Sequence, residues 1–204
     1  MQRFDKLITN GNPRSPAAEA YKTLRTNIQY AGFDRQIKSL LLTSCEPSEG
    51  KSLTAANLAI SIAQDGKKVL LVDCDLRKPM QRRVFNVMNI KGLTNVLAEG
   101  ADYREVVNDV NVDNLELITS GPKPPNPSEI LGSSKMQAFM DEITADYDMV
   151  ILDTPPMLPV TDATVLSRMV DGALLVVRYG QTTIEAAEIA KRQFEKVGAS
   201  VLGA

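Results

Sequence analysis

A Gly-Lys-Ser tripeptide, Gly50 to Ser52, constrains this chain more than any other feature because of what flanks it. Residues 37–43 form a short apolar run typical of a buried strand, and residues 53–63 carry apolar side chains at helical spacing. A turn from a strand into a helix points backbone N–H groups and the positive end of the helix dipole at one place, which favours an anion. In such a loop Lys51 reaches the β- and γ-phosphates of a nucleotide, and the Ser52 hydroxyl binds Mg²⁺. The residues expected to line this phosphate site are Glu46, Pro47, Ser48, Glu49, Gly50, Lys51, Ser52 and Leu53.

This loop matches the common phosphate-loop pattern only in part. That pattern has a glycine five residues before Gly50, and Cys45 stands there. Because a Gly-Lys-Ser tripeptide also occurs in ordinary loops that enter a helix, the rest of the chain has to decide between the two interpretations.

Composition narrows the kind of protein and the kind of chemistry. The chain has 204 residues, 44% of them hydrophobic, so we expect a single domain over residues 1–204 with a flexible segment at 1–14. It has no histidine, which excludes a histidine-based triad or zinc site. A formal net charge of −2 gives no reason to expect nucleic acid as a partner.

The cysteines and the hydropathy pattern favour the cytoplasm. Cys45 and Cys74 lack metal-ligand spacing, and we interpret them as small apolar fillers in a reducing compartment. No stretch approaches the ~20 apolar residues of a membrane span, and the N-terminus lacks the apolar core of a signal peptide.

Strand-like and helix-like segments alternate along the chain. Further apolar runs typical of buried strands lie at 68–73, 115–119, 149–153, 172–177 and, at its start, 199–202. Helical patterns begin near Ser15, at 127 (running to 145, with Asn126 or Ser128 as the cap) and at 184 (running to 197). Strands flanked by helices are covered on both faces, so the pattern predicts an α/β fold with a largely parallel sheet.

Three aspartates follow the ends of two of these strands. Asp73 and Asp75 close the run at 68–73, and Asp153 closes the run at 149–153. Ligands of parallel α/β sheets bind beyond the carboxyl ends of strands, where Lys51 and Ser52 also lie. Each aspartate alone could be a capped turn or a solvated charge, but together they suit a nucleotide with Mg²⁺, which needs acids to hold metal-bound waters or to accept a proton.

Four segments together resemble one protein family. They are Glu49-Gly50-Lys51-Ser52, the run Val-Asp-Cys-Asp-Leu-Arg-Lys-Pro at 72–79, the run Thr-Ser-Gly-Pro-Lys-Pro-Pro-Asn-Pro-Ser-Glu at 119–129, and Ile-Leu-Asp-Thr-Pro-Pro at 151–156. From about Ser15 to Ala204 the chain resembles the bacterial tyrosine kinases of capsular and exopolysaccharide synthesis, which belong to the MinD/ParA-like class of P-loop NTPases. The Arg-Lys-Pro and Pro-Asn-Pro-Ser-Glu sequences are what sets this family apart within the wider class.

The resemblance implies a P-loop α/β fold, ATP or ADP with Mg²⁺ as cofactors, and phosphorylation of protein tyrosines. It implies that Lys51 and Ser52 bind ATP and the metal, and that Asp75 and Asp153 organise the metal. It also implies catalysis by Asp73, Lys51 and Asp75, with Asp73 as the base for the incoming tyrosine hydroxyl.

The resemblance also implies partners. It suggests a separate kinase chain that is recruited to the inner face of the membrane and switched on by a transmembrane regulator of polysaccharide export, and opposed by a cognate tyrosine phosphatase. Ring assembly in the family uses a glutamate followed at intervals of three by two arginines, and the matching residues are Glu19, Lys22 and Arg25. Lys22 lacks the guanidinium fork, so an exposed helix face with weak pairs is the alternative for this row.

Other departures from the family leave alternatives open. The chain stops at Ala204 without the family's tyrosine-rich tail, and its five tyrosines form no cluster, so the chain is truncated or its substrates lie on other proteins. A positioning or partitioning ATPase of the same fold would carry a lysine where Glu46 stands. A non-catalytic nucleotide-binding module is the other alternative, and Asp73, Asp75 and Asp153 speak against it.

Overall fold

One sheet forms the centre of the computed structural model, which describes residues 7, 11–12, 14–31 and 36–204. Among these residues, seven strands lie in the order β3-β4-β2-β5-β1-β6-β7, with β3 antiparallel to β4 and every other neighbouring pair parallel. Their bounds are β1 (Ser39–Ser44), β2 (Val69–Asp73), β3 (Val107–Asp109), β4 (Leu115–Ile118), β5 (Met149–Asp153), β6 (Gly172–Val176) and β7 (Val201–Gly203).

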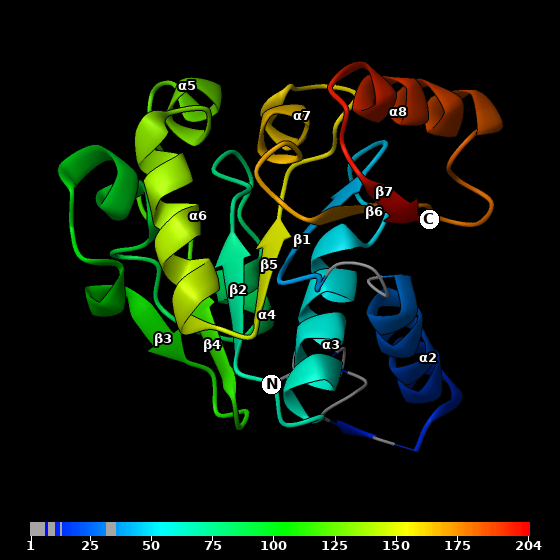
Figure 1. The fold of residues 1–204 in the computed structure, drawn as a ribbon, viewed down its shortest axis with the longest axis horizontal. Coiled ribbons are helices and arrows are strands. Elements are labelled where there is room, and N and C mark those ends of the chain that lie inside the picture. Colours follow the sequence, from blue (N-terminus) through cyan, green and yellow to red (C-terminus); the bar gives the residue numbers. More distant parts are fainter. Residues whose placement is uncertain (1–6, 8–10, 13, 32–35) are drawn as a thin grey trace.

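Helices cover both faces of this sheet (Figure 1). They are α2 (Pro16–Ala31), α3 (Lys51–Ala63), α4 (Gln81–Val84), α5 (Pro127–Leu131), α6 (Ser134–Asp146), α7 (Asp162–Leu166) and α8 (Ile184–Lys196), with a π-helical turn at Asn95–Glu99 and a 3₁₀ turn at Tyr103–Glu105. In the described part of the chain, no helix is long and apolar enough to cross a membrane.

Alternating side chains of the central strands enter two separate cores. In β1, Leu41 packs with residues of α5 to α8, whereas Leu40 and Leu42 pack with residues of α2, α3 and α4. In β2, Leu70 and Leu71 divide between the two cores in the same way. Because successive strand residues point to opposite faces, a strand covered on both sides has to be apolar throughout. This is why apolar and polar residues do not alternate in the sequences of these strands. The predicted α/β fold with a largely parallel sheet is confirmed.

The structure corrects the predicted helix over 127–145. It is two helices, α5 and α6, separated at Gly132 and Ser133. The Ser133 hydroxyl accepts a hydrogen bond from the Met136 N–H and so caps α6, which is the usual role of a serine at a helix start.

Strand β3 was not predicted, and one residue near the N-terminus, Leu7, belongs to the core. Strand β3 is three residues long, pairs on one side only and is not buried, so it has no apolar run to reveal it. Leu7, within the segment 1–14 that was expected to be flexible, is 1% exposed and packs in the core of α2 and α3. Residues 1–6, 8–10 and 13 lie outside the described residues.

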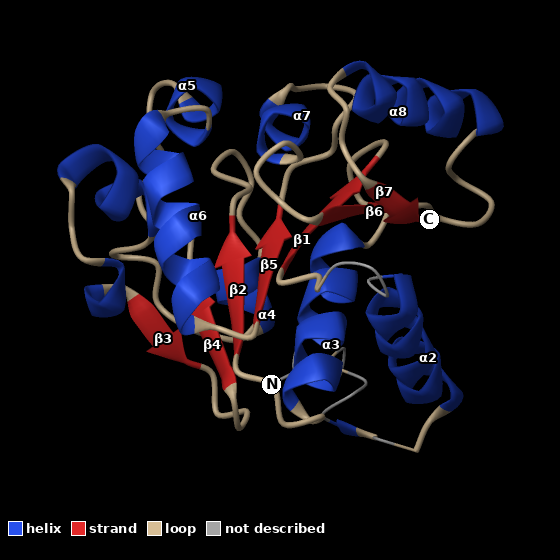
Figure 2. Ribbon diagram, in the orientation of Figure 1, coloured by secondary structure: helices blue, strands red, loops and turns tan. Residues whose placement is uncertain are grey.

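The parallel strands bring distant residues to one edge. The arrowheads of β2 and β5 point to the edge at which α5 and α7 lie (Figure 2). Asp73, the last residue of β2, is in register with Asp153, the last residue of β5. The loop after β1, which leads into α3, begins at the same edge.

Candidate functional site

The loop from β1 to α3, predicted to bind phosphate, has two residues with left-handed backbone. Gly50 is the N-cap of α3 with φ +101°, and Ser48 has φ +69°, so both adopt the left-handed region. A side chain at position 50 would meet no atom within 4 Å, so it is the backbone angle that calls for glycine here. Since glycine has no side chain to cap the helix, the first N–H groups of α3 are left for a ligand.

Side chains from the loop between β6 and α8 hold this phosphate loop in shape. Buried Glu49 accepts a hydrogen bond from the Glu46 N–H at 2.9 Å and a second one from the Thr182 hydroxyl. Arg178 Nη1 donates to the Ser48 carbonyl oxygen at 3.0 Å. We name these contacts of Arg178 and Thr182 the loop clamp.

Lys51 brings together the residues predicted to bind phosphate and metal. Its Nζ lies 3.1 Å from Asp75 Oδ2, 3.4 Å from Asp153 Oδ1 and 3.2 Å from Ser52 Oγ. Burial alone would lower the pKa of Lys51, but the charges of Asp153 and Asp75 outweigh it and raise the pKa above its ordinary 10.5. The lysine is therefore a firmly charged group that has to leave these carboxylates before it can hold a phosphate.

Asp73 and Asp153 are both fully buried at this edge, and Asp75 is 3% exposed. One oxygen of Asp73 accepts from the Gln81 N–H at 2.9 Å and the other from the Asp75 N–H at 3.2 Å. Burial raises the pKa of Asp73 well above 3.8, and repulsion from Asp153 raises it further against the stabilising Gln81 N–H. This carboxyl group therefore has a strong tendency to keep or take up a proton.

Gln81 is part of the site, and the sequence did not reveal it. The Gln81 side chain, at the start of α4, donates from Nε2 to Asp153 Oδ2 at 2.8 Å and to the Ser52 carbonyl at 2.9 Å. No common nucleotide motif asks for glutamine here, and the contacts join residues far apart in the chain, so the sequence carries no signal for them.

Two of the family-like sequence segments meet in space. Arg77 donates to both oxygens of Asp162 at 2.9 and 3.0 Å and to the Ser128 hydroxyl at 2.8 Å. The hydrogen bond to Asp162 raises the pKa of Arg77 above its ordinary, already high value. The Arg-Lys-Pro segment is thereby tied to the starts of α5 and α7, and Asp162, which belongs to none of the sequence motifs, is the link between them.

The oxygen groups around Lys51 suit Mg²⁺ together with a nucleotide. Serine hydroxyl and carboxylate oxygens are its usual protein ligands, and Mg²⁺ keeps several waters and takes phosphate oxygens rather than a closed protein cage. Within the described chain no group of three acidic or cysteine side chains forms a ready-made metal cluster. The residues present fit the metal.

Both cysteines are free and buried, as predicted for small fillers. Burial, followed by the charges of Glu49 and Glu46, raises the pKa of Cys45 to about 11. Burial also raises the pKa of Cys74, which lies between Asp73 and Asp75. Neither thiol is set up as a nucleophile.

The row on α2 lies on another part of the molecule and is not uniformly exposed. Lys22 pairs with Glu19 at 2.7 Å on the helix surface. Arg25 instead donates to the Ser61 carbonyl at 2.6 Å and pairs with Asp65 at 3.2 Å, with its side chain 18% exposed. Of the three residues predicted for the interface, Arg25 is held within its own chain, because Ser61 accepts a hydrogen bond from its guanidinium and Asp65 forms an ion pair with it.

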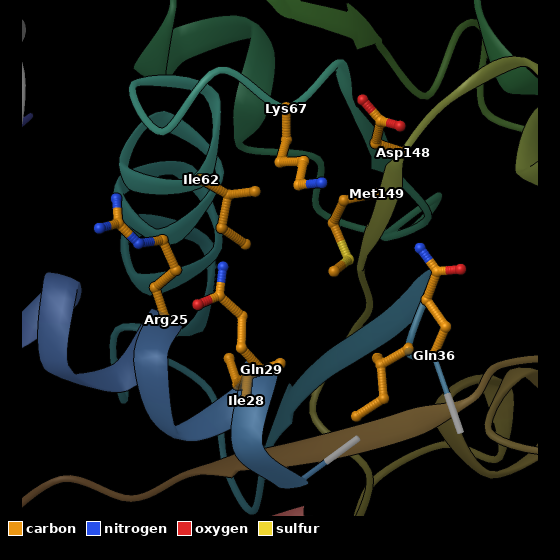
Figure 3. Close-up of a pocket in the computed structure, with 9 residues that line it drawn as sticks. Arg25, Ile28, Gln29, Gln36, Ile62, Lys67, Asp148 and Met149 are labelled. Atoms are coloured by element: carbon orange, nitrogen blue, oxygen red, sulfur yellow. The ribbon is translucent and has the colours of Figure 1, made fainter. Parts of the chain in front are cut away.

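A cavity of about 410 Å³ opens at the opposite, amino edge of the sheet (Figure 3). Arg25, Gln29, Lys67 and Met149 are among the residues that line it, and the Lys67 amine points into the opening. Because it lies at the starts of β1 and β5, this cavity is separate from the phosphate loop.

Comparison with protein families agrees with the site geometry. Residues 48–197 match the family model described as an AAA domain. The chain is 48% identical to the tyrosine-protein kinase YwqD of Bacillus subtilis over 204 residues, which is all of this chain and 85% of that protein. It is 38% identical to the putative tyrosine-protein kinase CapB of Staphylococcus aureus, over 97% of this chain and 87% of that protein.

Comparison with solved structures agrees with the likeness to tyrosine-protein kinases. The chimerical protein CapA2B2 matches with a TM-score of 0.94 at 38% identity, covering 100% of this chain and 89% of that chain. The kinase domain of Escherichia coli tyrosine kinase ETK matches with a TM-score of 0.93 at 36% identity, covering 97% and 78%.

MinD from Pyrococcus horikoshii matches with a TM-score of 0.68 at 21% identity, covering 80% of this chain and 67% of that chain, and this likeness shows the fold alone. The positioning-ATPase alternative is therefore only a distant one. By identity over its whole length, by its phosphate loop and by the acidic strand ends beside it, the chain belongs to the bacterial tyrosine-protein kinases.

Proposed function

We propose that this kinase transfers the γ-phosphoryl group of ATP to protein tyrosines at the carboxyl edge of β1, β2 and β5, with Mg²⁺ as the cofactor. The observation that carries the proposal is the convergence of Ser52, Asp75 and Asp153 on Lys51, whose Nζ is within 3.4 Å of an oxygen from each. A lysine, a hydroxyl and two carboxylates beside a helix N-terminus are the set that a nucleotide with its metal requires.

Each group has a distinct task in the proposed site. Lys51 and the N–H groups at the start of α3 bind the phosphates once the lysine has left Asp75 and Asp153. Ser52, Asp75 and Asp153 hold Mg²⁺, which when bound neutralises charge on the phosphates. Asp73 accepts the proton of the tyrosine hydroxyl, and its raised pKa supports this role because a base works best when its pKa lies near the working pH.

Calorimetry with Mg²⁺ and ADP tests the nucleotide site. Lys51→Met should weaken ADP binding at least tenfold, about 1.4 kcal/mol, because the lysine charge on the phosphates is lost. Lys67→Met, which removes an exposed lysine in the connection between α3 and β2, is the matched control and should leave the affinity unchanged. Equal affinities of Lys51→Met and wild type would remove the phosphate-loop interpretation.

A kinase assay on a tyrosine-containing peptide tests the assignment of the carboxylates. Asp73→Asn should abolish phosphorylation while ADP binding stays nearly intact, because the amide cannot accept the proton. Asp153→Asn should in addition raise the Mg²⁺ concentration needed for activity. Full activity of Asp73→Asn would mean that another residue is the base.

The physiological role is proposed from relatives. They include CapB and a putative tyrosine-protein kinase in the cps region of Klebsiella pneumoniae, so we infer regulation of capsular or exopolysaccharide synthesis. In the tyrosine-protein kinase wzc of Salmonella typhimurium the matching region is 28% of the protein, so there the kinase is part of a longer chain. This supports a partner for the present chain: a transmembrane activator that recruits it to the inner membrane face, with self-association and a cognate phosphatase. Addition of the activator's cytoplasmic segment should raise the rate of phosphorylation.

A further inference from the structure

Gln81 contacts all three acidic and phosphate-binding segments of the site. Its side-chain amide reaches Ser52 in the phosphate loop and Asp153 at the end of β5, and its backbone N–H reaches Asp73 at the end of β2. We propose that Gln81 is a positioning residue of the phosphoryl-transfer site. Its NH₂ group fixes Asp153 relative to the phosphate loop, and so positions a predicted metal ligand for the reaction.

The orientation of the amide is determined by its partners. Gln81 is 0% exposed, and both neighbours of its Nε2, the Ser52 carbonyl at 2.9 Å and Asp153 Oδ2 at 2.8 Å, are acceptors. Only the NH₂ end of the amide can donate to two acceptors, so a flipped amide would face both with its oxygen. The side chain therefore uses both of its donors to join Asp153 to the first turn of α3.

The other end of the same amide lacks a donor. Gln81 Oε1 is buried and has no hydrogen-bond partner among the described protein atoms. Buried carbonyl oxygens are nearly always paired, because an unpaired one loses its hydration without compensation. The unpaired oxygen is the cost of turning both amide donors to Ser52 and Asp153, so these two contacts are what hold the side chain in this orientation.

A purely structural role is the competing explanation, since the same contacts join α4 to α3. The two roles predict different effects when the glutamine side chain is replaced. A structural glutamine would change the melting temperature alone, whereas a positioning glutamine changes metal affinity and kcat in a folded protein. The proposal rests on the nucleotide site proposed above, and metal binding is measured separately from activity so that the two can fail independently.

The test is Gln81→Met, which keeps the length of the side chain and removes its hydrogen bonds. Mn²⁺ affinity in the presence of ADP is followed by electron paramagnetic resonance, and kcat and KM for ATP by peptide phosphorylation. We expect at least threefold weaker Mn²⁺ binding and at least tenfold lower kcat, with KM for ATP within threefold of wild type. Gln137→Met is the matched control, because Gln137 is exposed on α6 and its amide donates to Asp141 on the same helix.

Two results would overturn the proposal. One is a folded Gln81→Met protein with kcat and Mn²⁺ affinity within twofold of wild type. The other is a lowered melting temperature with unchanged Mn²⁺ affinity, which would leave Gln81 as a structural residue. If Gln81→Met does not fold, Gln81→Asn replaces it with the same criteria, because an amide one methylene shorter cannot span Ser52 and Asp153. If wild type shows no phosphorylation at all, the proposed function fails, and the Mn²⁺ measurement still decides the role of Gln81.

Discussion

Asp73 and Asp153 lie beside each other in register, both without exposure to solvent, and Lys51 contacts Asp153 directly. Two buried carboxylates at neighbouring strand ends repel each other, and one positive charge compensates for them only in part. The raised pKa of Asp73 is the result. A kinase that keeps such a group ionised at neutral pH does so at the expense of its folding stability.

A stability measurement can detect this cost. The pKa of Asp73 is higher in the folded than in the unfolded protein. Its contribution to the free energy of unfolding is therefore fully present below pH 3.8, and it is lost as the pH rises through the pKa of the folded protein. Asp73→Asn should therefore raise the melting temperature at pH 8, by roughly 2–4 °C for each kcal/mol recovered. The gain should shrink as the pH is lowered toward 5.

Differential scanning fluorimetry between pH 5 and pH 8 makes this comparison. Asp109→Asn, at an exposed position of β3, is the control and should show no pH-dependent difference from wild type. An Asp73→Asn protein that melts below wild type at pH 8 would show that the hydrogen bonds from Asp75 and Gln81 outweigh the repulsion.

Residues of the site could be predicted from the sequence where their position along the chain fixes their role. Lys51 and Ser52 belong to a loop motif, and Asp73 and Asp153 end apolar runs, so their meeting follows from the parallel sheet. Gln81 and Asp162 end no strand. Their side chains reach the site through hydrogen bonds to residues 72 and 85 positions away, and only the packed structure specifies such pairs.

At the scale of elements, the phosphate loop depends on the loop between β6 and α8. The loop clamp formed by Arg178 and Thr182 binds the Ser48 carbonyl and the Glu49 carboxylate. In this loop, Ser48 and Gly50 have left-handed backbone angles. A backbone that adopts positive φ at a serine needs support from its surroundings. The clamp provides it from a segment more than 120 residues away in the chain.

Removing one contact of the clamp should loosen the phosphate loop. Thr182→Val keeps the shape of the side chain and removes the hydroxyl that binds Glu49, so ADP affinity should fall by about three- to tenfold, in line with the ~1 kcal/mol that one hydrogen bond contributes. Calorimetry measures the affinity. Thr23→Val removes a hydroxyl that binds a carbonyl within α2 and should leave the affinity unchanged. Identical ADP binding by both variants would mean that the loop holds its shape without the clamp.

The bounds of buried helices and strands could be predicted from the sequence. Bounds set by a local turn, or by the edge of the sheet, could not. The apolar run at 149–153 coincides with β5, because a central strand is apolar from end to end. The break between α5 and α6 was missed since Ile130 and Met136 keep an apolar helical pattern across it, and the cap at Ser133 ends that pattern locally. Strand β3 was missed because its residues are half-exposed at an edge.

At the scale of the whole molecule, the α2 surface is the predicted contact between copies. Glu19 and Lys22 lie on the outside of the helix, whereas Arg25 is bound to Ser61 and Asp65 of the same chain. A variant of Arg25 would therefore disturb folding and assembly together. A test of assembly has to use the two outer residues.

Glu19→Ala with Lys22→Ala should shift the protein toward monomer in light scattering at moderate salt, with its melting temperature changed by no more than a few degrees, because exposed pairs contribute little to stability. Higher salt should act in the same direction by screening the charges. Arg25→Ala is the comparison and should lower the melting temperature, since it leaves the Ser61 carbonyl without its guanidinium donor. Wild type that stays monomeric at high concentration, with and without nucleotide, would mean that the α2 row is an ordinary solvated face.

The ion pairs of Lys51 have a consequence for turnover. The ammonium group that is expected to hold the phosphates has two carboxylates to return to, at 3.1 and 3.4 Å. In the proposed function, a nucleotide competes with Asp75 and Asp153 for this charge, and part of its binding energy breaks the two ion pairs. ADP has one phosphate fewer than ATP and should compete less well, so the return of Lys51 to its carboxylates is expected to favour product release.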